Sequence, residues 1–201
     1  DVERSRGLGD VYKRQVKEFS LKIGTALKRM EQLIQSMLKI TRIDAGSISF
    51  EKSNYSIPNI INHAISELTT RADNEKKEIV IDGDLEQMLY CDIEWTGEAI
   101  GNIIKNALDH TDTGGKISIS WEQTPAMIRI FITDNGHGIS QEDIHHIFKR
   151  FYRSKNTSES QGIGLGLPLA KAIVEGQGGI LSVQSELLQG TTFTLSFLTE
   201  S

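Results

Sequence analysis

The chain has 201 residues, of which 38% are hydrophobic and 24% charged, and its net charge is −5. These values favour a soluble globular protein over a disordered chain, and the acidic balance argues against a nucleic-acid partner. The single cysteine, Cys91, excludes an intrachain disulfide. No apolar run approaches the roughly 18 residues of a membrane-spanning helix. We therefore expect a cytoplasmic fragment, with any membrane attachment in parts of the parent protein outside it.

Two different segments precede the main domain. Residues 1–15 mix charges with glycine and lack periodicity, so we expect a disordered or non-native tail there. Residues 16–46 predict a long bundle or coiled-coil helix that ends at the C-cap glycine Gly46. Its apolar residues recur at alternating spacings of four and three: Ile23, Leu27, Met30, Ile34 and Met37. This stripe predicts a homodimer through residues 16–45.

Residues 47–201 alternate between helical and strand patterns. The predicted elements are a strand at 47–50, a helix from Pro58 to about Asp73, strands at 78–81 and 87–90, a helix from 92 to about 110, a hairpin of 116–121 and 127–133, short helical pieces within 141–152, a helix at 165–175, and strands at 179–184 and 191–197. This order predicts an α+β fold, a two-layer sandwich in which three helices cover one face of a mixed sheet.

The helix at 98–110 carries two amides on one face. Asn102 and Asn106 are four residues apart, so both side chains project the same way. Their oxygens could ligate a metal and their nitrogens could reach phosphate oxygens. Taken alone, the pattern also fits an ordinary helix with two surface asparagines.

Two glycine-containing segments follow. The sequence DNGHG, residues 134–138, comes directly after an apolar strand, and its glycines would let a flat ring lie against the backbone. An ordinary turn remains the alternative there. The sequence GIGLG, residues 162–166, opens a helix and suits an anion. It fits neither the dinucleotide fingerprint nor the P-loop. Between them, the cations of FKRFYR and the polar residues that follow suit a lid.

In this order, the segments resemble the catalytic and ATP-binding domain of sensor histidine kinases, in the GHKL superfamily of Bergerat-type ATPases. NIIKNALDHT matches the N box, DNGHGI the G1 box, IFKRFYR the F box, GIGLGLPLAKAIVEGQGG the G2 box, and GTTFTLSF the closing strand. The likeness runs from residue 47 to the C-terminus. The preceding LIQSMLKITRIDAG resembles the second helix of the family's dimerisation and phosphotransfer bundle.

The resemblance implies ATP and Mg²⁺ as ligands, and it assigns roles to individual residues. By this resemblance, Asp134 would accept a hydrogen bond from the adenine amine and Asn106 would ligate the magnesium ion. Asn102 would contact a phosphate or a metal-bound water. Arg153 and Lys155 would neutralise phosphate charge. The remaining implied contacts are Gly136, Gly138 and Ile139 around the adenine, Gly162, Gly164, Leu165, Gly166 and Leu167 at the phosphates, and Thr192 with adenine through water.

The sequence departs from the family pattern at two points. None of the five histidines has the context of the family's phosphoacceptor, so we expect the fragment to bind ATP without phosphorylating itself. In the intact protein, the phosphoryl group would pass to a response regulator. Asp109 stands where many members have a lysine directed at phosphate, and its charge would weaken triphosphate binding.

Two other functions stay open. A hydrolytic GHKL ATPase would carry a glutamate base four residues before the metal-binding asparagine, but Asn102 occupies that position. A non-catalytic module that binds nucleotide and dimerises through its helix is the second alternative, and Asp109 is its best support.

Overall fold

The computed structural model describes residues 2–154 and 162–199, with side chains from residue 15 onward. The chain divides into two compact units, residues 1–38 and 39–201, and each is described by itself.

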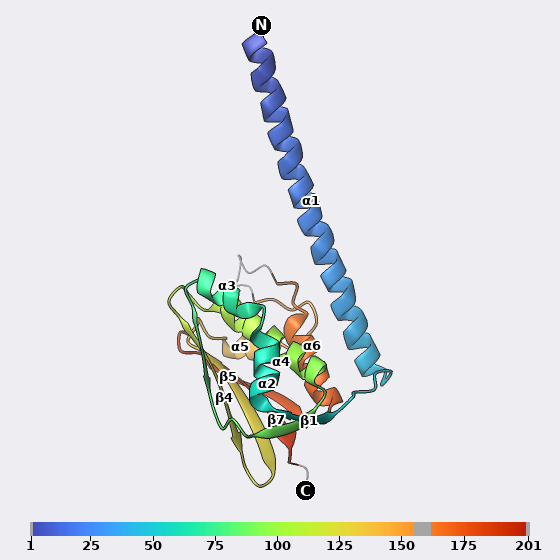
Figure 1. Ribbon diagram of the computed structural model, residues 1–201, viewed down its shortest axis with the longest axis vertical. Helices are drawn as coiled ribbons and strands as arrows, with labels where there is room; N and C mark the ends of the chain where they lie inside the picture. The colour runs from blue at the N-terminus through green and yellow to red at the C-terminus, as the bar shows by residue number, and fades with distance from the viewer. Residues whose placement is uncertain (1, 155–161, 200–201) are drawn as a thin grey trace. The chain divides into compact units, whose positions relative to one another are not determined.

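A single helix, α1 (Val2–Asp44), contains all described residues of the first unit, and its last residues, 39–44, are counted in the second unit (Figure 1). It begins within the segment where we expected a tail without regular structure. The segment contains no proline, and an isolated glycine costs a helix only about 1 kcal/mol, so its two glycines do not interrupt the hydrogen bonding. Most large apolar side chains of α1 between residues 16 and 38 are exposed, whereas Ile40, near the end of the helix, is buried. Among the described residues, no helix has the length and apolarity needed to cross a bilayer.

The second unit contains a five-stranded sheet in the order β2-β4-β5-β7-β6. Its strands are β2 (Glu78–Asp82), β4 (Lys116–Gln123), β5 (Met127–Asp134), β6 (Ile180–Glu186) and β7 (Gly190–Leu198). The β2–β4 pair is parallel and the other three pairs are antiparallel. The sheet is therefore mixed, as expected.

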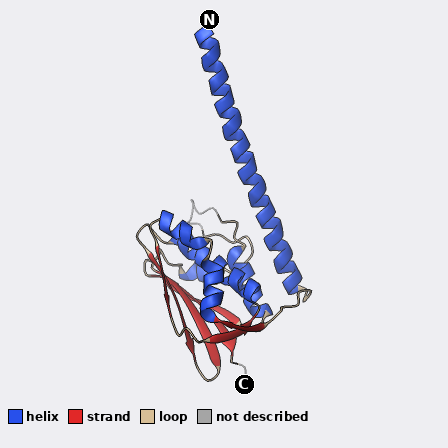
Figure 2. Cartoon of the chain, viewed as in Figure 1, coloured by secondary structure: helices blue, strands red, loops and turns tan. Residues whose placement is uncertain are grey.

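Helices cover one face of this sheet (Figure 2). They are α2 (Ile57–Ile65), α3 (Leu68–Asn74), α4 (Ile93–His110), the short α5 (Gln141–Ile144) and α6 (Gly166–Gly176). Alternate strand residues point into the core between the layers, and fully buried examples are Ile117, Ile119, Ile130, Phe193 and Leu195. The predicted α+β fold with helices on one face of a mixed sheet is confirmed.

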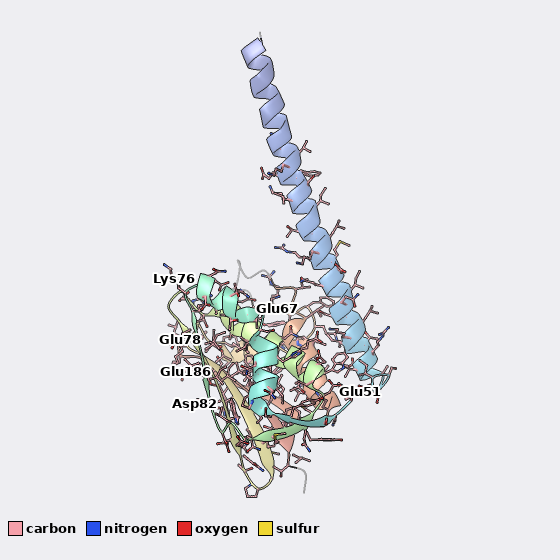
Figure 3. All side chains as sticks on the ribbon, viewed as in Figure 1. Glu51, Glu67, Lys76, Glu78, Asp82 and Glu186 are labelled. Carbon is pink, nitrogen blue, oxygen red and sulfur yellow. The ribbon has the colours of Figure 1, made fainter. Side chains whose placement is uncertain are left out.

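Two local elements differ from the expectation. The helix predicted from Pro58 to Asp73 is divided into α2 and α3, with Ser66 Oγ donating to the His63 carbonyl at the break. A hydroxyl that bonds the local backbone competes with the helix in this way. The strand predicted at 47–50 instead forms at β1 (Ser53–Ser56), which pairs with β3 (Met88–Cys91) in a separate two-stranded sheet. Glu51, labelled in Figure 3, precedes it.

A buried polar cluster fixes the start of α4. The Asp92 carboxylate caps the helix by accepting from the backbone N–H groups of Glu94 and Trp95, at 3.1 and 3.2 Å. Gln177, just after α6, accepts from the Asp92 N–H at 2.8 Å and donates to Thr96 Oγ1 at 3.0 Å. The N-terminus of α4 is thereby tied to the C-terminus of α6, and this tie sets which faces of the two helices meet.

Candidate nucleotide-binding site

The amide face of α4 meets the first turn of α6. Asn102 Nδ2 donates to the Glu98 carbonyl at 3.0 Å, which leaves Oδ1 directed at α6. A Cβ atom added to Gly166 would lie 3.2 Å from that oxygen, so a side chain there would push the Asn102 amide away by a few tenths of an ångström. Asn106, one turn further along α4, is half-buried. The structure therefore brings Asn102 together with the glycine run, as the motifs predicted.

The start of α6 is open to an anion. Its N-cap residue is Leu165, which has no polar side chain to accept from the first-turn N–H groups. Gly164, with φ of +74°, accepts from the Phe151 N–H at 2.9 Å and so ties the glycine run to the segment before residue 155. A helix start with uncapped N–H groups beside an asparagine oxygen can hold a phosphate and a hydrated cation.

Asp134 lies at the end of β5 and is only 3% exposed. Burial raises the pKa of its carboxyl above the ordinary aspartate value, and hydrogen bonds from the backbone of Gly136 and Thr191 offset this only in part. The bond from the Gly136 N–H to Oδ1 is 2.9 Å long. A buried carboxylate with a fixed orientation is suited to accept a hydrogen bond from a ligand amine.

The loop after Asp134 is held on both sides by backbone contacts. The His137 N–H donates to the His110 carbonyl at the end of α4, and the His137 carbonyl accepts from the Leu188 N–H in the turn between β6 and β7. The Ile139 N–H donates to Ser185 Oγ at 2.8 Å. The loop therefore joins α4, β6 and the β6–β7 turn around Asp134.

Gly136 and Gly138 allow this fit. A Cβ on Gly136 would lie 2.1 Å from the His110 carbonyl oxygen, and one on Gly138 would lie 2.0 Å from the Glu186 carbonyl oxygen. Gly138 also has φ of +70°, which other residues rarely adopt. The requirement for glycine at these two positions is thus steric.

Thr192 differs from its predicted placement. In the β5–β7 register Asp134 pairs with Thr191, and Thr192 pairs with Thr133. Neighbouring residues of a strand point to opposite faces, so Thr191 shares the face of Asp134 while Thr192 lies on the sheet face away from the helices. There Thr192 bonds Thr133 through the hydroxyls at 3.0 Å. Thr191 is 5% exposed and its hydroxyl bonds Ser185 Oγ at 2.9 Å. Thr191, and not Thr192, therefore lies on the face of the sheet that Asp134 shares.

Of the two cations expected to neutralise phosphate charge, Arg153 and Lys155, only Arg153 is described. Lys155 lies outside the described residues, and Arg153 is exposed. The adjacent Tyr152 hydroxyl and Ser154 Oγ both donate to Asp143 of α5, the latter at 2.6 Å. These bonds lower the pKa of the Asp143 carboxyl. The chain that leads toward residue 155 is therefore anchored to α5.

The charge of Asp109 has a partner that the sequence did not reveal. Arg71 Nη2 of α3 lies 2.6 Å from Asp109 Oδ1. The two residues are 38 positions apart, and no local pattern pointed to their contact. The repulsion expected of Asp109 is thus countered by an adjacent cation.

A separate depression of about 300 Å³ lies at the ends of β5, β6 and β7. It borders Asp134 and Thr191, but no residue of α4 or α6 lines it. It is therefore not the site that the motifs predicted.

The described residues fit a nucleotide with its magnesium ion. A side chain at Gly166 would crowd the Asn102 amide oxygen at the first turn of α6, and the buried Asp134 carboxylate lies at the end of β5, where the loop that contacts α4 begins. Within the described part of the chain, no group of three or more His, Cys, Asp or Glu side chains could hold a metal by itself. Mg²⁺ takes oxygen ligands and keeps several waters, and the side-chain amide oxygens of Asn102 and Asn106 are oxygen donors of that kind.

Comparison with known proteins gives a consistent result. Residues 91–201 match the family described as histidine kinase-, DNA gyrase B-, and HSP90-like ATPase. The chain is 30% identical to the sensor protein SrrB of Staphylococcus aureus over 170 residues, which are 84% of this chain and 29% of SrrB. The chain therefore spans less than a third of the length of this curated relative.

Two solved structures have a similar fold. The mycobacterial sensor histidine kinase MprB has a TM-score of 0.65 at 25% identity, covering 73% of this chain and 97% of that chain. Full-length ShkA in complex with AMPPNP has a TM-score of 0.75 at 20% identity, covering 86% of this chain and 36% of that chain.

Replacement of Asp134 by asparagine should stabilise the ligand-free protein at neutral pH. Burial raises the pKa of the Asp134 carboxyl in the folded protein above its value in the unfolded chain. Ionisation of this carboxyl therefore lowers the stability of the fold, and the full cost is present at every pH above the folded-state pKa. Asp134→Asn removes this cost, on the order of 1 kcal/mol, and its advantage should vanish as the pH falls below the ordinary aspartate value near ~3.9. Denaturant unfolding at a series of pH values measures the difference.

Asp143→Asn is the matched control, with the opposite sign. Its native pKa is lowered, so its carboxylate stabilises the fold at neutral pH and this stability is lost as the pH falls. If Asp134→Asn is less stable than the unchanged protein at pH 7, burial does not dominate the energetics of this carboxylate.

Proposed function

Because the chain belongs to the family of histidine kinase-, DNA gyrase B-, and HSP90-like ATPases, we propose that it is the ATP-binding kinase domain of a sensor histidine kinase. In this proposal it holds Mg·ATP for transfer of the γ-phosphoryl group to a histidine on a bundle helix, and the intact protein relays it to a response-regulator aspartate. The observation that carries the proposal is the buried Asp134, fixed by the loop that joins α4 to the β6–β7 turn.

The proposed roles follow the geometry. Asp134 accepts from the adenine amine, and Thr191, rather than Thr192, shares its face and takes the water-mediated contact. Asn106 ligates the magnesium ion, and the Asn102 amide and the N–H groups at the start of α6 bind the phosphate chain. Gly162, Gly164 and Gly166 let the backbone approach the phosphates, with Leu165 and Leu167 alongside.

The chemistry demands little of the protein beyond position and charge. Mg²⁺ neutralises charge that develops on the phosphoryl oxygens, and the protein must orient the γ-phosphate toward its acceptor. Arg153 and Lys155 add positive charge at the edge of the site. The acceptor is not proposed among the five histidines, since all lie between residues 63 and 146, within or beside the elements of the ATP-binding domain.

Two features support a kinase over a hydrolytic ATPase. Asn102, four residues before Asn106, is an amide that bonds the Glu98 carbonyl and cannot serve as a general base for water. SrrB, a sensor protein, resembles the chain over 84% of its length, which includes part of α1, and MprB, a sensor histidine kinase, resembles it over 73%. The proposed site also has support from ShkA, whose similar structure contains AMPPNP.

Nucleotide binding is tested by titrating Mg·ADP and a non-hydrolysable Mg·ATP analogue into the protein by calorimetry. We expect the unchanged chain to bind both and Asp134→Ala to lose about a hundredfold in affinity, the loss expected for a buried, charge-assisted hydrogen bond. Asp82→Ala, which removes an exposed carboxylate at the end of β2 (Figure 3), should change neither affinity. Absence of binding by the folded, unchanged protein would contradict the proposal.

Hydrolysis separates the two catalytic alternatives. With no carboxylate at position 102, the chain should bind Mg·ATP without sustained release of inorganic phosphate above the buffer rate. A phosphate-release assay measures this, and Asp134→Ala identifies any contaminating ATPase. Steady turnover that Asp134→Ala abolishes would favour a hydrolytic member of the family.

The first unit should mediate self-association. Exposed apolar side chains follow one another along α1, among them Phe19, Ile23, Leu27, Met30 and Ile34. We expect a dimer through residues 16–45, measured by light scattering at high micromolar concentration, and expect Ile34→Glu to weaken it at least tenfold because a charge would be buried in the contact. Gln35→Glu places the same charge one residue away on an exposed position and serves as the control. A strict monomer would contradict the proposal.

A further inference from the structure

Asp109 continues the amide face of α4. Asn102, Asn106 and Asp109 are spaced by four and three residues, so they follow one another along one side of the helix. The Cβ atoms of residues three apart on a helix are about 5–6 Å from each other, which places the Asp109 carboxylate beside Asn106. An isolated negative charge at that position would oppose a polyphosphate.

The structure places a guanidinium against this carboxylate. Arg71 Nη2 donates to Asp109 Oδ1 at 2.6 Å, and Arg71 Nε donates to Glu75 Oε1 at 2.6 Å. Lys77 completes the group, since its Nζ lies 2.5 Å from Glu75 Oε2 and 2.7 Å from the Leu108 carbonyl oxygen. Two cations and two anions thus connect α3 to the C-terminal end of α4, and the group as a whole adds no net charge.

The two cations differ in what they can reach. The Lys77 side chain is 9% exposed and its charge faces Glu75 and the end of α4. The Arg71 side chain is 32% exposed. A guanidinium carries five N–H donors, and the bonds to Asp109 and Glu75 engage one on Nη2 and the one on Nε. Arg71 therefore keeps donors for an anion while two carboxylates fix its orientation.

We propose that Arg71 binds the phosphate chain of the nucleotide and that Asp109 positions its guanidinium, so that α3 supplies the cation at this edge of the site. The inference rests on the proposed nucleotide-binding function. Asp109 then acts as a positioning residue, and its negative charge is compensated by the residue that it orients. A planar, forked donor held by carboxylates suits phosphate oxygens better than a flexible lysine.

Two simpler roles for Arg71 give different results. If the ion pair only joins α3 to α4, loss of Arg71 should weaken every ligand equally or affect stability alone. If Arg71 only neutralises Asp109, removal of both charges together should restore the original affinity for triphosphate. Direct phosphate binding predicts that neither result occurs.

The experiment measures binding of the non-hydrolysable Mg·ATP analogue by calorimetry and of adenosine by NMR shift titration, which registers weak binding. The proteins are the unchanged chain, Arg71→Gln, and the double variant Arg71→Gln/Asp109→Asn, in which no carboxylate at position 109 is left without its partner. Arg129→Gln is the matched control, because Arg129 is a partly exposed arginine of β5 whose carboxylate partner is Glu122. Thermal unfolding of each variant checks the fold.

We expect Arg71→Gln to weaken the triphosphate about tenfold or more, as for a lost charge-assisted contact, and to leave the adenosine affinity within twofold. The double variant should bind the triphosphate about fivefold more weakly than the unchanged chain does. The control Arg129→Gln should bind both ligands with the affinities of the unchanged chain. Full recovery in the double variant, an unchanged triphosphate affinity in Arg71→Gln, or equal losses for both ligands would overturn the inference. If the unchanged chain binds neither ligand, the proposed function itself fails and the role of Arg71 fails with it.

Discussion

Backbone groups from different elements come into direct contact around Asp134, and the geometry of the candidate site depends on that contact. A Cβ on Gly190 would lie 1.9 Å from the Asp134 carbonyl oxygen, and Gly136 and Gly138 are as closely placed against His110 and Glu186. These contacts bring the end of α4, the loop after β5 and the β6–β7 turn to one point. Any side chain at the three glycines would separate elements that must meet, so backbone shape, more than side-chain packing, locates the carboxylate.

The buried carboxylate is the cost of this arrangement. Placing Asp134 among buried groups disfavours its charged form, and two backbone hydrogen bonds offset the penalty only in part. A ligand amine would complete the set of donors that water supplies in the unfolded chain. Because the loop already holds the carboxylate in place, such a ligand would spend little free energy on ordering it. The same features that make the ligand-free site less stable therefore make it selective for a donor at that position.

Much of the fold followed from the periodicity of the sequence, and the exceptions have physical reasons. α4, β4 and β5 lie close to their predicted bounds because each alternates regularly between a buried and an exposed side. At the break between α2 and α3 the Ser66 hydroxyl bonds the His63 carbonyl, and hydrophobic periodicity does not register such a local contact. Thr192, predicted to contact adenine, is one residue from Thr191, which pairs with Asp134, and one residue along a strand moves the side chain to the other face. Motif spacing locates a strand, but only its register with Asp134 determines the face.

The charge of the site could not be predicted from its motifs, because it depends on a contact between separate helices. Asp109 is close in sequence to both asparagines, and from the sequence alone its negative charge belongs to their face. Its partner, Arg71, comes from α3, whose own sequence shows only an ordinary pair with Glu75 four residues later. Folding places the cation beside the carboxylate at 2.6 Å, so the electrostatic character of this edge is that of the pair. A charged residue within a binding motif is therefore informative about ligand affinity only once its tertiary partner is known, and α3 is part of the candidate site for that reason.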